Sequence, residues 1–312
     1  MDNLATVASQ VGILFALMGV GSLCRRFRLI DARSVKGIVN VLLMVVTPCL
    51  IVSVFQRPFD RSMMYSFAVA FLIAFIAHIA VIALASFTAR GDERSLPVLK
   101  VATVFSNAGF MGIPLEHALL GEEGVFYGIV YVVMFNLFMW SWGLNTMKNL
   151  PSEKGGLELN RMMFLNPGTV GIAAGIPLFL FSVELPAVVK TPVDMLADLN
   201  TPLAMLVIGY YLAGAKLSKV LRTPAAHIAA FIRLIAFPFA VLAVLYLLRG
   251  CLDRTMMLAI VIAVSAPVGA MVTMFASKYG RDVDLSVGLV SGTTLLSVMT
   301  MPVVIAIAME VL

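Results

Sequence analysis

Long apolar runs follow one another along the chain, separated by short polar stretches, and this alternation predicts a series of membrane-spanning helices. About twenty apolar residues cross a bilayer as a helix, and a helix satisfies its own backbone hydrogen bonds inside lipid. The runs are long enough for ten spans. We expect these spans at residues 4–23, 35–56, 62–89, 96–119, 123–147, 167–184, 192–215, 225–248, 254–277 and 283–311.

The predicted fourth span contains residues that an ordinary membrane helix has no reason to carry. Asn107, Gly109, Gly112 and Pro114 all fall within the string NAGFMGIPL. Gly and Pro interrupt a helix, and an Asn inside lipid must find a polar partner. A break at membrane depth is tolerated where it lines a cavity or is buried in protein. This segment is therefore the best pointer to a substrate site.

The composition places the chain among membrane proteins. Of its 312 residues, 61% are hydrophobic and 12% are charged, and the mean hydropathy is +1.01. Soluble domains carry about 25% charged residues. The longest loop, 149–166, contains PSEKGG and lies near the chain centre. We interpret it as a cytoplasmic linker between two five-helix units, residues 1–148 and 167–312, which together form one membrane domain.

Basic residues alternate in density from one predicted loop to the next. Sixteen lie in the loops of one side, five lie on the other side, and Arg233 lies inside a span. The rich side should be cytoplasmic, so both termini of a ten-span protein face outside. This bias explains the net charge of +5 without a nucleic-acid partner. We expect a multi-pass protein of the cell (plasma) membrane whose first span is retained, because no basic region or small-residue cleavage site precedes residue 23.

One spacing of polar residues recurs in the two halves of the chain. In span 2, Asn40 lies seven residues before Thr47-Pro48, and in span 7, Asp194 lies seven residues before Thr201-Pro202. The match suggests that spans 2 and 7 occupy equivalent places in two repeats.

A second recurring spacing relates spans 4 and 9. Ser106 lies fifteen residues before Gly121, and Ser265, which opens the string Ser-Ala-Pro, lies fifteen residues before Gly280. Because each half holds five spans, an odd number, the second half must enter the membrane from the opposite face. The prediction is an all-α membrane protein of about ten transmembrane helices in two inverted five-helix repeats.

Several strings resemble the auxin efflux carrier family. They are SNAGFMGIPL, NPGTVGIAAGIPLFLF, TPLAMLVIGYYLAGAKL and APVGAMVTMFASKYGRDVDLSVGLVSGTTLLSVMTMP, and Asn136 lies in the span that follows the first of them. The resemblance covers nearly the whole chain and implies a ten-helix inverted repeat in which the broken helices 4 and 9 cross. Plant members export auxin, and bacterial members are described as carriers of malonate, malate or similar carboxylates. The chain lacks the long central loop of some plant members and resembles the short prokaryotic type. Val268 stands where plant members present a polar side chain, which argues against auxin.

The candidate substrate site follows from these breaks and kinks. Half-helices direct the partial positive charge of their N-termini into a cavity, and an Asn amide can donate to a carboxylate. The alternative for Asn107 is a hydrogen bond that only holds helices together, and the prolines can be simple kinks. We expect the substrate to contact Asn107, Gly109, Pro114, Thr47, Pro48, Thr201, Pro202, Ser265, Pro267, Gly269, Asn136 and Arg233.

Two intramembrane charges admit two interpretations each. Asp198 lies about two turns inside span 7 and, with Asn40, is the candidate for ion coupling to H⁺ or Na⁺; otherwise it is a cap or interface residue. Arg233 either extends its side chain to the cytoplasmic face or supplies a counter-charge for a second substrate carboxylate. Coupling can also be absent altogether.

Other classes of activity lack their motifs. The histidines and the widely spaced cysteines give no metal-ligand spacing, and neither a nucleophile elbow nor a phosphate loop occurs. We predict a secondary transporter, not an enzyme, without a cofactor, that moves small organic anions such as mono- or dicarboxylates across the bilayer by alternating access. The alternatives are an anion channel or a substrate-sensing membrane protein of the same fold. Whether the protein is a monomer or a homodimer is left open.

Overall fold

The structure is a computed structural model that describes residues 2–148, 167–214 and 217–312. The predicted linker 149–166 lies outside the described residues. The first half holds α1 (Asp2–Arg26), α2 (Ala32–Val41), α3 (Thr47–Val54), α4 (Arg61–Thr88), α5 (Ser95–Val104), α6 (Ile113–Phe138) and α7 (Leu144–Lys148). The second half holds α8 (Pro167–Leu180), α9 (Ala187–Ala197), α10 (Asn200–Leu212), α11 (Ser218–Leu221), α12 (Pro224–Phe231), α13 (Phe237–Leu248), α14 (Arg254–Ser265), α15 (Met271–Lys278) and α16 (Val283–Val311). The expected all-helical fold is confirmed.

Seven helical stretches within the described ranges are long and apolar enough to cross a membrane. They are Leu4–Arg26, Ala32–Val54, Arg61–Thr88, Ala108–Lys148, Ala187–Leu212, Pro224–Leu248 and Val283–Val311. Shorter apolar helices cover Ser95–Val104, Gly168–Leu180 and Arg254–Ser265. The number differs from the ten predicted spans partly because the interrupted spans divide into short helices. In addition, predicted spans 4 and 5 join into one long stretch, although Gly121 inside it has a non-helical backbone with φ of 69°.

Wide π-helical turns interrupt several helices just before a proline. The segments η1 (Leu42–Val46), η2 (Ala108–Gly112) and η5 (Ile232–Ala236) each end two residues before Pro48, Pro114 or Pro238. Proline lacks an N–H and its ring clashes with the carbonyl four residues earlier, so the hydrogen-bond ladder shifts there. A further π-helical segment, η3 (Met139–Gly143), follows α6 without a proline.

The first helix of each half packs against the second span of the other half. Helix α1 contacts α10, and α8 contacts α3. Where α1 meets α10, a Cβ added to Gly209 would overlap the backbone of Met18, and a Cβ added to Gly21 would overlap the backbone of Leu206. Small residues permit such close approach between membrane helices.

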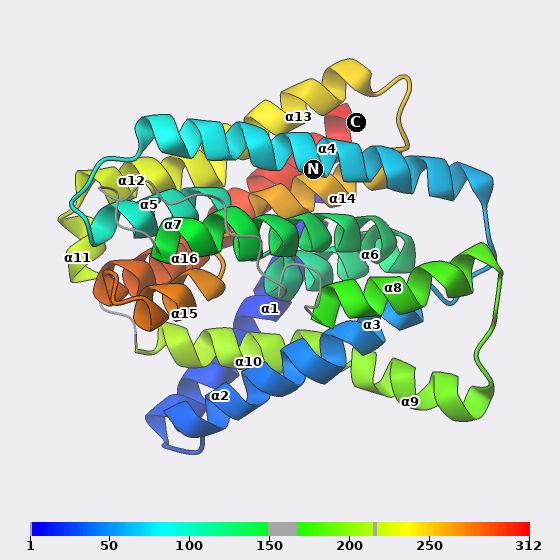
Figure 1. The fold of residues 1–312 in the computed structure, drawn as a ribbon, viewed down its shortest axis with the longest axis horizontal. Coiled ribbons are helices and arrows are strands. Elements are labelled where there is room, and N and C mark those ends of the chain that lie inside the picture. Colours follow the sequence, from blue (N-terminus) through cyan, green and yellow to red (C-terminus); the bar gives the residue numbers. More distant parts are fainter. Residues whose placement is uncertain (1, 149–166, 215–216) are drawn as a thin grey trace.

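Helices α5, α6 and α14 form the centre of the molecule. Figure 1 shows α4 along one side of them and α2, α3, α9 and α10 on the opposite side. The buried apolar residues form a large cluster around α4, α6 and α14 and a smaller one that joins α1, α2 and α10 to Met111, Leu115 and Ile262. The centre therefore contacts both clusters.

Polar contacts connect the loops in two separate groups. In the first group, Arg25 donates to the carbonyl of Tyr210, and Lys219 donates to the carboxylate of Asp282. Arg281 donates to the carbonyl of Met147, and the backbone N–H of Asp282 donates to the carbonyl of Arg94. In the second, Arg57 pairs with Glu122, Gln56 accepts from Leu185, and Arg254 donates to the carbonyl of Met309. The first group joins loops predicted to be rich in basic residues to the span ends beside them, and the second does the same for the other loops.

Candidate functional site

Two interrupted helices meet backbone to backbone at the centre of the fold. The N–H of Asn107 donates to the carbonyl of Pro267 at 2.6 Å, and the N–H of Gly269 donates to the carbonyl of Phe105 at 2.9 Å. Ser106 and Val268 thereby form an isolated antiparallel bridge. The interruption between α5 and η2 and that between α14 and α15 satisfy each other's freed backbone groups, as buried backbone requires. We call the residues 105–107 and 266–270 the crossover.

The side chain of Asn107 is available at the crossover. Asn107 is buried at 6% exposure, and its side chain does not cap the helical segment that follows it. Its carbonyl accepts from the N–H groups of Met111 and Gly112 at the start of that segment. Helix N-termini leave N–H groups unsatisfied and carry partial positive charge, so the positions after Asn107 favour a negatively charged group.

Gly269 permits the close approach of the two segments. A Cβ on Gly269 would lie 3.2 Å from the carbonyl oxygen of Ser106, which is tighter than ordinary van der Waals contact. Pro267, beside it, is buried and contributes its carbonyl to the bond from Asn107. The hydroxyl of Ser265 turns back to the carbonyl of Val261 at 2.6 Å, within its own helix.

Arg233 connects the ends of both half-helices that lead into the crossover. Its side chain is completely buried. The guanidinium donates to the carbonyl of Val104, the last residue of α5, at 2.8 Å, and also to the carbonyl of Val264 near the end of α14. A cation at a helix C-terminus is favourable because the terminal carbonyls carry partial negative charge. The interpretation that Arg233 extends to the cytoplasmic face is wrong, because burial holds it between the two helix ends.

Arg233 belongs to a group of buried polar side chains that each have an atom without a hydrogen-bond partner. Among the described residues, the Nε of Arg233, the hydroxyl of Tyr131, the hydroxyl of Ser106 and the Nε2 of His78 are buried and lack a hydrogen bond of normal geometry. The Tyr131 hydroxyl faces both Ser106 and Arg233, and its ring lies 4.7 Å from the ring of His78. Buried polar groups are normally satisfied, so such a cluster needs a water molecule or a ligand. Tyr131 and His78 are site candidates that sequence reasoning missed.

Several predicted site residues use their polar groups locally. The hydroxyl of Thr47 donates to the carbonyl of Leu42 at 2.8 Å, and the amide of Asn136 donates to the carbonyl of Val132 at 2.8 Å. Pro48 lies in the first turn of α3. These bonds repair the backbone next to a kink or hold the side chain against its own helix.

The remaining predicted residues lie at various distances along the interrupted spans. Thr201 and Pro202 are half-buried in the first turn of α10, a helix that contacts η2. Gly109 lies in η2 and Pro114 lies in the first turn of α6, both within two turns of Asn107. Asn40 is exposed on α2, and Asp198 is exposed where α9 ends before α10 begins.

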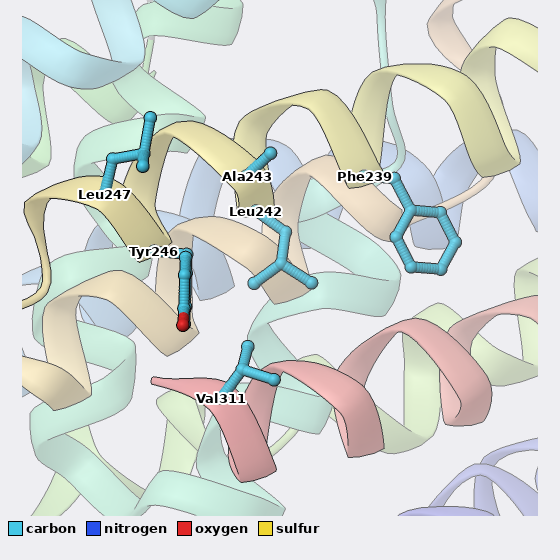
Figure 2. A pocket seen from close by; sticks show the side chains of 6 residues that line it. All are labelled: Phe239, Leu242, Ala243, Tyr246, Leu247 and Val311. Atoms are coloured by element: carbon cyan, nitrogen blue, oxygen red, sulfur yellow. The ribbon is translucent and has the colours of Figure 1, made fainter.

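An apolar groove elsewhere on the molecule does not belong to this site. Figure 2 shows it between α13 and the end of α16, lined by Phe239, Leu242, Ala243, Tyr246, Leu247 and Val311. Leu247 is among the most exposed apolar side chains of the described chain. A surface of this composition suits lipid chains, and none of these six lining residues is charged.

A central crossover of interrupted helices, inside a fold of long apolar helices, is typical of membrane transport proteins. The sequence model of a family described as "Membrane transport protein" matches residues 6–305. The chain therefore belongs to this family, which is that of the auxin efflux carriers, and the resemblance seen in its motifs is confirmed. No curated protein matches the chain with significance.

Proposed function

We propose that this protein is a secondary transporter of small organic anions, mono- or dicarboxylates, which bind at the crossover and cross the membrane by alternating access. The observation that carries the proposal is the buried positive character of the crossover. Arg233 is a completely buried cation with carbonyl partners, and no described carboxylate forms an ion pair with it. The start of η2 adds the partial positive charge of a helix N-terminus.

The proposed architecture is ten spans in two inverted repeats. The exchange of contacts between halves supports it, because α1 packs on α10 as α8 packs on α3. Gly121 and Gly280, which lie at matching offsets after Ser106 and Ser265, both have positive φ, 69° and 63°. In a pseudo-symmetric carrier the substrate binds between the repeats near mid-membrane, and one group of helices moves against the other.

The proposal is tested by binding and counterflow with purified protein. A panel of mono- and dicarboxylates should include members that raise the thermal stability of the protein, since a ligand stabilises the state that binds it. In proteoliposomes loaded with such a ligand, external labelled ligand should enter by saturable counterflow. Flux that rises linearly with concentration and shows no counterflow would indicate a channel. A panel in which only neutral or cationic compounds exchange would overturn the anion assignment.

The proposed orientation, with both termini and the loop around Cys251 outside the cell membrane, rests on the two groups of loop contacts and on the basic bias. It is tested by labelling intact cells with a membrane-impermeant maleimide. Cys251 is exposed and should react in a variant that lacks the other two cysteines. In a cysteine-free background, the variant Ser152→Cys should react only after the membrane is permeabilised. The reverse pattern would overturn the orientation.

A further inference from the structure

Glu116 is a completely buried carboxyl group that lies outside the crossover. It lies on α6, nine residues after Asn107, and is 0% exposed. Neither of its carboxyl oxygens has a hydrogen-bond partner among the described residues. Leaving a carboxylate unpaired in an apolar environment is very unfavourable, whereas the protonated acid is tolerated far better.

The space around this carboxyl group is shaped by glycines. A Cβ on Gly128, which follows the non-helical Gly121 in α6, would overlap both Oε atoms of Glu116. On the other side, a Cβ on Gly112 would lie 3.7 Å from Oε1 and 3.6 Å from the Cα of Ala263 on α14. The non-helical Gly121 divides α6 into two segments. The carboxyl group therefore lies between these two segments, close to the point where α6 packs against α14.

The ionisable groups on the elements packed against α6 have other partners or lie elsewhere. Arg254 on α14 donates to the carbonyl of Met309, His78 on α4 bonds the carbonyl of Ala74, and Tyr131 on α6 itself faces Ser106 and Arg233. The more distant α1 and α10 contribute Arg25 and Tyr210, which contact each other, α3 contributes Cys49, and α8 has no ionisable residue. None of the other described ionisable side chains on α1, α4, α6 and α10 bonds a carboxyl oxygen of Glu116; they are Cys24, Arg26, Arg61, Tyr65, His117, Glu122, Glu123, Tyr127 and Tyr211.

We propose that Glu116 is a proton-binding site that couples proton movement to transport, an inference that rests on the proposed transporter function. In the buried arrangement the carboxyl group holds its proton. When movement of α6 relative to α14 opens the site to water, the carboxyl O–H bond breaks and the proton passes to a water molecule, and the carboxylate takes a proton from water on the other side. Among the described residues, no group of three or more acidic, His or Cys side chains could hold a metal ion.

The first experiment detects the proton without any transport. Infrared difference spectra of the purified protein in lipid should show the carbonyl stretch of a protonated carboxylic acid at about pH 7, where an exposed glutamate is ionised. The band should be absent from the neutral isostere Glu116→Gln. It should persist in the control Glu123→Gln, which changes an exposed glutamate of the same helix. Absence of the band from the wild type would overturn the proposal even if a variant failed to fold. Persistence of the band in folded Glu116→Gln would overturn it as well.

The second experiment measures coupling in proteoliposomes. A proton gradient should drive accumulation of a carboxylate by the wild type and by Glu123→Gln. Glu116→Gln should lose this accumulation yet keep counterflow, because exchange needs no net proton movement. Retained proton-driven accumulation in Glu116→Gln would show that the buried acid is only structural. If the wild type moved no carboxylate while the infrared band was present, the proposed function would fail and proton binding would stand.

Discussion

Arg233 on η5 and Glu116 on α6 are both completely buried ionisable side chains, but their surroundings differ in kind. Arg233 donates to the carbonyl ends of α5 and α14, which are natural acceptors for a cation. The carboxyl oxygens of Glu116 lie beside Gly112 and Gly128, and no described group donates a hydrogen bond to them. Arg233 has backbone partners for both of its terminal nitrogens, while the carboxyl group of Glu116 has no partner in the described part of the chain.

This difference suggests that Arg233 positions the helices around it, whereas Glu116 can exchange a proton. Guanidinium donors that hold two helix ends must remain in place, so we expect Arg233 to fix the geometry of the crossover. A carboxyl group that nothing holds can gain or lose a proton without breaking a contact. Burial alone would not have distinguished these roles, because both side chains are 0% exposed.

The largest effect is expected from Arg233→Leu. The substitution leaves the carbonyls of Val104 and Val264 without their buried donor, at about 1–3 kcal/mol each, so the protein should lose ~2–6 kcal/mol of stability. Thermal unfolding in detergent and the yield of folded protein measure this loss. Arg233→Lys keeps the charge but not the fork that reaches both helix ends, so its stability should be intermediate. If Arg233→Leu unfolded at the wild-type temperature, the arginine would not hold the crossover together.

A smaller effect, on binding and not on folding, is expected from Asn107→Ala. Loss of one hydrogen bond to a charged group costs about 1.5–3 kcal/mol, which is about one to two decades of substrate affinity. Ligand titrations followed by thermal shift provide the affinity. Asn136→Ala is the matched control, because that amide already bonds the carbonyl of Val132 in its own helix. Equal affinities for Asn107→Ala and the wild type would leave Asn107 a packing role only.

Gly128→Ala tests whether the space around Glu116 is specific. The added methyl group would overlap the carboxyl oxygens, so we expect a loss of about 1–3 kcal/mol, typical of overpacking. Gly12→Ala on α1, where nothing lies near the added atom, is the control. Removing the overlap in the double variant Gly128→Ala, Glu116→Ala should recover part of the loss, with an interaction energy of about 0.5–3 kcal/mol. Additive effects would mean that the two residues do not share one site.

The sequence identified the crossover because its residues are incompatible with an uninterrupted helix. Pro114 and Pro267 lack a backbone N–H and cannot continue the interior of a helix, and the interruption in the first half begins next to Asn107. The backbone bridge between Ser106 and Val268 could be expected only from the family resemblance. No local rule pairs two segments so far apart in the chain.

The roles of side chains were less predictable, because they depend on tertiary packing. Glu116 lies nine residues after Asn107, and its burial beside Gly112 and Gly128 depends on how the helices pack. Arg233 was expected at a membrane face or on a substrate, and its partners are carbonyls of two other helices. In contrast, Thr47 bonds within its own helix, as a hydroxyl next to a proline kink can do without any tertiary partner.

The smallest effect is expected from Asp198→Asn, and it completes the comparison of the ionisable groups. Asp198 is exposed at the end of α9, whereas Glu116 is enclosed, so neutralising Asp198 removes no buried charge. We expect transport by Asp198→Asn to keep the wild-type dependence on pH and Na⁺, while Glu116→Gln becomes insensitive to pH. Initial rates across a pH series, with and without Na⁺, measure both variants in the same vesicles. If Asp198→Asn changed the profile and Glu116→Gln did not, the coupling site would lie at the interruption between α9 and α10. The unpaired carboxyl group on α6 would then be a structural feature of the fold.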